Sequence, residues 1–206
     1  MSCSDIIVIV MAAGQSRRFG SDKRIAQLSN GKTLLTSTLL TIQQHFPNIT
    51  VVLKEGDKAQ SLGLSPITPT LVSQRSHLGL GYSISDAFKY LCSDEKFNHY
   101  RSAAVWLADL PWVTQKTCKL LADMSSAENI VQPTHLQVPG HPVIFGRQFW
   151  KHIADLRHPS GASAILQRYS DHIVKISLND PGVCYDVDTP DSLSPPPSDI
   201  LTMTIL

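Results

Sequence analysis

The sequence predicts an α/β fold in which helices cover both faces of a mostly parallel β-sheet, giving three layers. Short apolar runs rich in β-branched residues recur along the 206-residue chain, as they do in buried parallel strands. Stretches with helical periodicity lie between these runs. The first two runs enclose one such stretch, and a β-loop-α-β unit of this kind implies two parallel strands with a right-handed connection.

The expected strands follow the apolar runs in chain order. The clearest are residues 6–10, 49–53 and 103–107, and shorter ones are expected at 66–69, 71–74, 130–132 and 173–176. Residues 138–145 begin with a Pro-Gly turn and are expected to form half of a hairpin.

The expected helices are residues 33–46, 79–91, 114–124, 149–156 and 160–169. Pro47 ends the first of them, because proline cannot continue a helix. Thr114 is expected to cap the third helix, and Thr189 with Pro190 to start a final turn or helix.

Length and composition indicate one domain followed by a tail. A chain of 206 residues that is 42% hydrophobic suits one α/β domain, which we expect to span residues 1–193. The Ser-Pro-Pro-Pro-Ser sequence at 194–198 cannot form regular structure. Residues 194–206 are therefore expected to be a mobile tail.

Charge and cysteine usage exclude several classes of protein. The net charge of +1 gives no electrostatic reason to expect nucleic acid or an anionic membrane as a partner. The four cysteines lie far apart without a C-x-x-C pair, which argues against a zinc site or a disulfide framework. No basic leader precedes the first apolar run, which is too short to span a membrane, so a cytoplasmic protein is expected.

The loop after the first strand has the composition of a polyphosphate-binding loop. It combines small residues with three cations: Ala12, Ala13, Gly14, Gly20, Arg17, Arg18 and Lys23. Small side chains let backbone N–H groups approach phosphate oxygens, and the cations offset the phosphate charge. The alternative is a basic turn after a core strand.

Acidic residues follow two later apolar stretches. Asp109 lies just past the expected strand 103–107, at the sheet edge where open α/β proteins bind ligands, and is well placed for Mg²⁺. The alternative is that Asp109 caps a turn before Pro111. If residues 183–188 were a strand, its alternation would turn Asp186 and Asp188 to the same face.

Two further stretches could contact a ligand. Gly79 and Gly81 open onto an expected helix, whose N-terminus could hold an anion or a ligand carbonyl. His141 lies between a glycine and a proline, where it could contact a substrate or remain solvated.

Two other nucleotide-binding motifs are absent. A P-loop would need glycine at the position of Ala26, so an ATPase is not favoured. A dinucleotide-binding loop would need glycines at the positions of Ser16 and Phe19, so a dehydrogenase is not favoured either.

Five separated stretches, taken together, resemble one family. They are A-A-G-x-S-x-R-x-G with a lysine three residues on (12–23), G-L-G-Y-S-I (79–84), L-A-D-L-P (107–111), G-H-P-V-I-F (140–145) and D-V-D-T-P-D-S-L (186–193). Their order and motifs are similar to those of the MobA-like NTP transferase family, in particular its molybdenum cofactor cytidylyltransferase (MocA-like) branch. The resemblance implies a Rossmann-like sheet of the nucleotide-diphospho-sugar transferase type.

The resemblance also implies a reaction and a set of site residues. The terminal phosphate of a pterin cofactor attacks the α-phosphorus of a nucleoside triphosphate and expels pyrophosphate, with Mg²⁺ bound by Asp109 and Asp188. Arg18, Lys23 and Asp109 would be catalytic, and Gly140 and His141 would lie on the acceptor side. The nucleotide would contact Ala12, Ala13, Gly14, Ser16, Arg18, Lys23, Gly79, Gly81 and Ser83.

Within the family, the second alanine of A-A-G is typical of enzymes that use CTP, whereas enzymes that use GTP have A-G-G. Ala13 therefore implies CTP, with GTP as the alternative. The expected acceptor is molybdopterin, a molybdoenzyme is a possible partner, and related enzymes use other phosphorylated acceptors. Residues 157–163 lack the acidic residue and the arginine of the family's G-D-x-G-A-R motif, a departure that favours a non-catalytic cofactor-binding protein as a third hypothesis.

Overall fold

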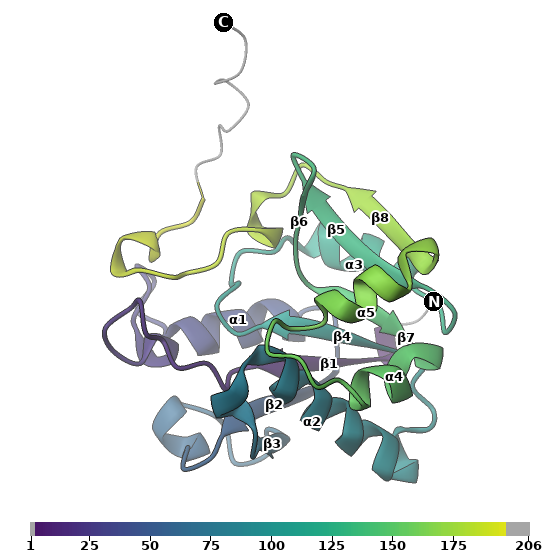
Figure 1. The fold of residues 1–206 in the computed structure, drawn as a ribbon. Coiled ribbons are helices and arrows are strands. Elements are labelled where there is room, and N and C mark those ends of the chain that lie inside the picture. Colours follow the sequence, from purple (N-terminus) through teal and green to yellow (C-terminus); the bar gives the residue numbers. More distant parts are fainter. Residues whose placement is uncertain (1–2, 197–206) are drawn as a thin grey trace, which may run out of the picture.

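One mixed β-sheet runs through the protein (Figure 1). The computed structural model describes residues 3–196. The strand order is β3-β2-β1-β4-β7-β5-β6, and β8 pairs with β5. The strands are β1 (Ile6–Met11), β2 (Asn48–Lys54), β3 (Thr70–Ser73), β4 (Ser102–Leu107), β5 (Ile130–His135), β6 (Val138–Pro139), β7 (Val143–Gly146) and β8 (Ile173–Ser177).

The sheet is mostly parallel, as the sequence predicts. β1 pairs in parallel with β2 and β4, β2 with β3, and β5 with β8. β7 runs antiparallel between β4 and β5, and β6 runs antiparallel to β5. The strand expected at 138–145 is thus two strands, because Gly140 packs against Val183 and Pro142 has no N–H to donate to a sheet ladder.

Helices cover both faces of the sheet, which confirms the three-layer α/β/α class. Along β1, Ile6, Val8 and Val10 pack with α1 (Leu34–Gln43) and α3 (Gln115–Met124). The alternate residues Ile7, Ile9 and Met11 pack with the helices of the other face, α2 (Leu80–Ser93), α4 (Trp150–Ala154) and α5 (Ser163–Arg168). β1 is therefore buried on both faces, which explains its unbroken apolar sequence.

Local signals predict the starts of helices better than their ends. The hydroxyl groups of Thr33 and Thr114 accept hydrogen bonds from the first turns of α1 and α3, so the predicted cap at Thr114 is confirmed. α4 and α5 are shorter than expected, and Gly161 lies between them with a φ of +64°. The strand expected at 66–69 is absent, and the single strand of this stretch is β3, which pairs with β2 over Thr70–Ser73.

The loop after β1 and the segment after β8 meet at the carboxyl edge of the parallel strands, where Figure 1 shows the purple and yellow parts of the chain close together. This edge holds the candidate site. Residues 3–196 include no helix that is long and apolar enough to cross a membrane. Most of the predicted mobile tail, residues 197–206, lies outside the described residues.

Candidate active site

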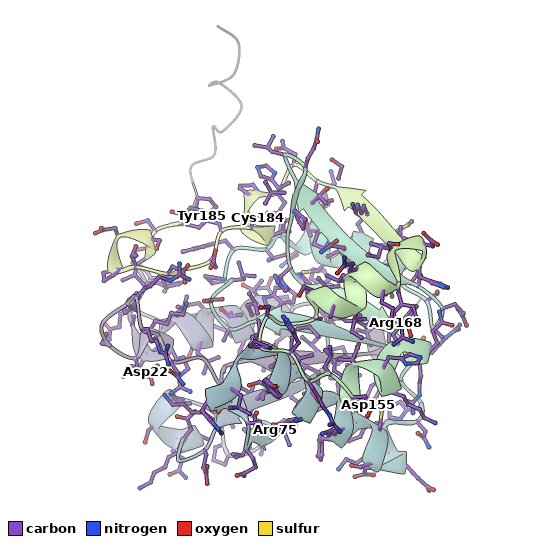
Figure 2. The ribbon with its side chains drawn as sticks, in the orientation of Figure 1. Asp22, Arg75, Asp155, Arg168, Cys184 and Tyr185 are labelled. Atoms are coloured by element: carbon purple, nitrogen blue, oxygen red, sulfur yellow. The ribbon has the colours of Figure 1, made fainter. Side chains whose placement is uncertain are left out.

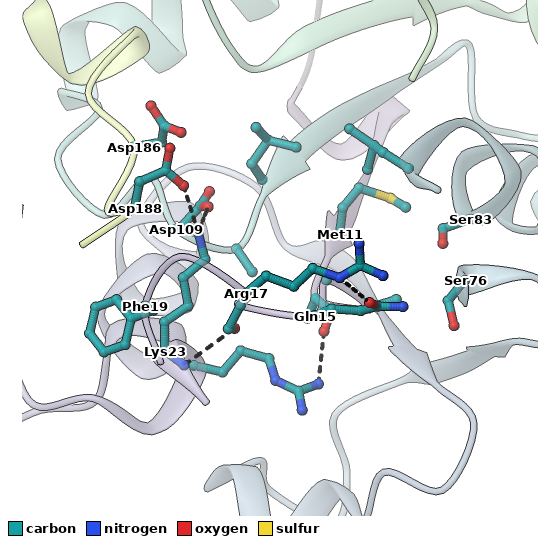
Figure 3. Close-up of a pocket in the computed structure, with 18 of the residues that line it drawn as sticks. Met11, Gln15, Arg17, Phe19, Lys23, Ser76, Ser83, Asp109, Asp186 and Asp188 are labelled. Atoms are coloured by element: carbon teal, nitrogen blue, oxygen red, sulfur yellow. Dashed lines mark hydrogen bonds and ion pairs between the residues drawn. The ribbon is translucent and has the colours of Figure 1, made fainter. Parts of the chain in front are cut away.

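A pocket of about 540 Å³ opens at the carboxyl ends of β1 and β4 (Figure 3). It is lined mainly by residues 11–19, 76–80 and 107–109, with Lys23, Ser83, Asp186 and Asp188. Figure 3 shows the three labelled aspartates at one end of the pocket and Ser76 and Ser83 at the other, with Arg17 between them.

The pocket brings together ten of the thirteen site residues that the family resemblance implies. They are Ala12, Ala13, Gly14, Ser16, Arg18, Lys23, Gly79, Ser83, Asp109 and Asp188. The other three, Gly81, Gly140 and His141, are not among the residues that line the pocket.

Three carboxylates converge at one end of the pocket. Asp109, Asp186 and Asp188 each place an oxygen atom within 4.8 Å of the other two. Residues 183–188 do not form a strand. The Val187 N–H donates to the carbonyl oxygen of Asp109 at 3.1 Å, which joins this stretch to the end of β4. The buried Val187 side chain nevertheless leaves both flanking aspartates facing Asp109.

Lys23 contacts two members of the carboxylate cluster (Asp109, Asp186 and Asp188). Its Nζ atom lies 2.6 Å from Asp109 Oδ2, 2.9 Å from Val187 O and 3.3 Å from Asp188 Oδ1. Although burial opposes it, the charge of Asp109 and then the contacts with Asp188 raise the pKa of the Lys23 ammonium group. Lys23 is therefore charged throughout the neutral pH range.

Arg18 provides a second cation at the same end of the pocket. Its Nη2 atom lies 2.7 Å from Asp188 Oδ2, and three-quarters of its side chain is exposed. An exposed ion pair of this kind contributes little to stability, so Arg18 can leave Asp188 for a phosphate at small cost.

The donor set of the carboxylate cluster fits a divalent cation. Asp109 Oδ1 is buried and has no hydrogen-bond partner among residues 3–196. Burial, followed by the charges of Asp188 and Asp109, raises the pKa of the Asp186 carboxyl. An unsatisfied carboxylate oxygen in a group of mutually repelling carboxylates is the arrangement that a Mg²⁺ or Mn²⁺ ion stabilises.

Arg24 holds the loop that carries Lys23. The buried guanidinium group donates to both carboxylate oxygens of Asp22 and of Asp57, and to the carbonyl oxygen of Ala12 at 2.8 Å. These bonds join the end of β1 to the turn after β2. Asp57 lies 33 residues from Arg24 in the chain, so no local sequence signal predicts the contact.

A second polar network supports the other end of the pocket. Ser73 Oγ lies 3.3 Å from Ser83 Oγ and donates to Asp86 Oδ2 at 2.8 Å. Arg75 donates to Asp86 Oδ1 through two nitrogen atoms. Although burial opposes it, the bonds from Arg75 and Ser73 lower the pKa of the Asp86 carboxyl. Figure 2 shows Arg75 next to the start of α2, and its network keeps the Ser83 hydroxyl at the pocket wall.

Gly81 has a packing role in the structure. Its N–H donates to Pro159 O at 3.1 Å, so this N–H is not free for a ligand. A Cβ atom at position 81 would lie 2.0 Å from His158 O. The start of α2 and the loop at 158–161 therefore pack so closely that only glycine fits at this position.

A Gly81→Ala substitution is expected to lower the free energy of unfolding by about 1–3 kcal/mol, the usual cost of overpacking. Urea unfolding followed by circular dichroism measures this change. Gly14→Ala is the matched control, because a Cβ atom at Gly14 would meet nothing within 4 Å. Equal stability of the two variants would contradict the packing role.

The predicted acceptor-side residues, Gly140 and His141, do not line the pocket. A Cβ atom at Gly140 would lie 2.5 Å from Val183 O, and the His141 N–H donates to the same carbonyl oxygen at 2.8 Å. Burial lowers the pKa of the His141 imidazole, an effect that the Val105 carbonyl and the Asp109 carboxylate oppose. His141 thus lies within electrostatic reach of the carboxylate cluster without lining the pocket.

A loop of small residues and cations that faces an acidic cluster across one pocket is an arrangement for handling nucleotide phosphates. Comparison with known families identifies the class: residues 8–173 match the family model of the MobA-like NTP transferase domain. The chain belongs to this family, as the motifs indicate.

Solved structures of similar fold cover nearly the whole chain. A mycobacterial homologue of Rv0371c, from Mycobacterium sp. strain JC1, is 23% identical, with a TM-score of 0.77 over 93% of this chain and 94% of that one. Rv0371c of Mycobacterium tuberculosis is also 23% identical and has been solved in complex with manganese, with a TM-score of 0.72 over 91% of this chain and 95% of that one. Molybdopterin-guanine dinucleotide biosynthesis protein A of Archaeoglobus fulgidus is 18% identical, with a TM-score of 0.60 over 90% of this chain and 94% of that one.

Among curated proteins, the chain is similar to the bifunctional protein GlmU of Legionella pneumophila. The two are 28% identical over 171 residues, which make up 82% of this chain and 33% of GlmU. The chain therefore spans about a third of the length of the curated relatives it matches.

Proposed function

We propose that the protein transfers CMP from CTP to the terminal phosphate of the molybdenum-pterin cofactor and releases pyrophosphate. The observation that carries the proposal is the pocket itself. Lys23 and Arg18 face Asp109 and Asp188 within 3.3 Å, at the place where a triphosphate and a divalent cation would meet. The loop of small residues at 12–16 lines the same pocket.

The chemistry needs positioning and charge neutralisation more than acid–base catalysis. Backbone N–H groups of residues 13–16 would hold phosphate oxygens, while Lys23 and Arg18 would balance the negative charge on the departing pyrophosphate. A phosphate oxygen of the acceptor forms the new bond to the α-phosphorus of CTP, and the bond from that phosphorus to the bridging oxygen of pyrophosphate breaks. Asp109 and Asp188 would hold Mg²⁺, with Asp186 as a third oxygen donor, and the ion would act as Lewis acid and template.

The choice of CTP rests on Ala13, which lines the pocket at the position where family members that use GTP have glycine. The choice of a pterin acceptor rests on the G-H-P-V-I-F motif at 140–145 and on the similar fold of the Archaeoglobus protein. As an enzyme that consumes CTP, the protein would act in the cytoplasm and pass its product to a molybdoenzyme.

A transferase with another phosphorylated acceptor is the second candidate. The similar proteins include GlmU and a 4-diphosphocytidyl-2C-methyl-D-erythritol synthase from Anaerococcus prevotii. Residues 157–163 lack the charged pair of the family motif, and the loop at 158–161 touches the start of α2 beside the pocket.

The test is to incubate the protein with molybdenum-loaded cofactor, Mg²⁺ and each nucleoside triphosphate in turn, and to follow pyrophosphate release. Release with CTP and not with GTP is expected. Equal or faster release with GTP would overturn the base assignment. Release that requires a different phosphorylated acceptor would overturn the pterin assignment. Cofactor binding without pyrophosphate release would favour the third hypothesis, a non-catalytic cofactor-binding protein.

A further inference from the structure

The Lys23 ammonium group lies among the oxygen atoms that the proposed function assigns to the metal. A lysine ammonium group has three N–H donors. Nζ has three oxygen atoms in reach, one each from Asp109, Val187 and Asp188, at 2.6, 2.9 and 3.3 Å. In this arrangement no N–H of Lys23 remains for a nucleotide phosphate.

The charges of the cluster are nearly balanced without a metal ion. Three carboxylates, Asp109, Asp186 and Asp188, contribute −3, and Lys23 with Arg18 contributes +2, which leaves −1. Lys23 is the more buried of these two cations, because 16% of its side chain is exposed against 75% for Arg18. A divalent ion placed on the same oxygen atoms would meet the positive charge of Lys23 at close range.

We propose that Lys23 is the resident cation of the carboxylate cluster in the nucleotide-free protein, and that a divalent metal binds well only when Lys23 turns to the triphosphate. The inference rests on the proposed function, because it takes the cluster as the metal site. The triphosphate gives Lys23 a new anionic partner and frees Asp109 and Asp188. Metal and nucleotide therefore bind with positive coupling, each strengthening the other.

This role gives Lys23 opposite effects on two measurable quantities. Without Lys23 the cluster carries −2, so the free protein binds a divalent cation more tightly, while catalysis loses a cation that neutralises phosphate. A lysine that only contacts phosphate leaves metal binding by the free protein unchanged. A lysine that organises the carboxylates for the metal weakens metal binding when it is removed.

The experiment is a titration of the nucleotide-free protein with Mn²⁺, in which electron paramagnetic resonance measures the unbound ion. Lys23→Met, which keeps the length of the side chain and removes its charge, is expected to bind Mn²⁺ at least about tenfold more tightly than the wild type, because one positive charge within a few ångströms is lost. Lys32→Met is the matched control, since Lys32 is exposed and its loss changes the net charge by the same amount.

Each outcome decides the inference. Equal or weaker Mn²⁺ binding by Lys23→Met overturns it while leaving the metal site in place. An equal gain in Lys32→Met overturns it by attributing the effect to net charge. Absence of Mn²⁺ binding in both the wild type and Lys23→Met overturns the metal site and the inference together. Lys23→Gln, with thermal melting of each variant, provides a second neutral side chain if the methionine variant does not fold.

Discussion

Replacing Asp109 by alanine is expected to reduce turnover by at least about 10²–10³-fold, the usual cost of removing one preorganised charged group from an active site. Asp109 follows β4 directly and supplies a buried oxygen atom with no other partner among residues 3–196. Its loss removes the most buried ligand of the proposed metal site. The measurement is the initial rate of pyrophosphate release at saturating nucleotide and Mg²⁺.

The fold is expected to survive the Asp109→Ala substitution. Lys23 keeps its contacts with Asp188 and with the Val187 carbonyl oxygen, so no buried charge is left without a partner. Thermal melting and circular dichroism check this point. Asp123→Ala is the matched control, because Asp123 forms an exposed ion pair with Lys119 on α3. Wild-type turnover in Asp109→Ala would remove Asp109 from the metal site.

Lys23→Ala is expected to lower kcat/KM for the nucleotide by about 10²-fold. Lys23 is far less exposed than Arg18, the other cation that contacts the carboxylate cluster, and its ammonium group is the one that would turn from Asp109 to the triphosphate. Steady-state kinetics over a range of CTP concentrations measures the change. Lys32→Ala, on the exposed turn before α1, controls for the loss of one charge. An unchanged kcat/KM in Lys23→Ala would show that Lys23 has no part in the use of the nucleotide.

Much of the site can be predicted from the sequence because its parts lie at the ends of buried strands. The apolar run of β1 predicts where the small-residue loop begins, and the run of β4 predicts that Asp109 lies at the carboxyl edge. The rule that ligands bind at this edge then brings the two together. Lys23 and Asp109 are 86 residues apart in the chain and meet in the structure as this reasoning requires.

Other features depend on contacts that no local pattern encodes. No sequence pattern singles out Arg24, and its contact with Asp57, beyond β2, makes it the buried support of the loop. Gly81 reads as part of a binding turn, whereas the loop at 158–161 makes it a packing glycine. Asp186 and Asp188 do face one site, but through the buried Val187 and its bond to Asp109 rather than through strand alternation.

Labelled CTP shows whether this pocket transfers a nucleotidyl group. With molybdenum-loaded cofactor and Mg²⁺, label in the α-phosphate of CTP is expected to move to the cofactor, and label in the γ-phosphate is expected to appear in pyrophosphate. Recovery of the α-label as free CMP, or of the γ-label on the cofactor, would rule out transfer of CMP to the cofactor.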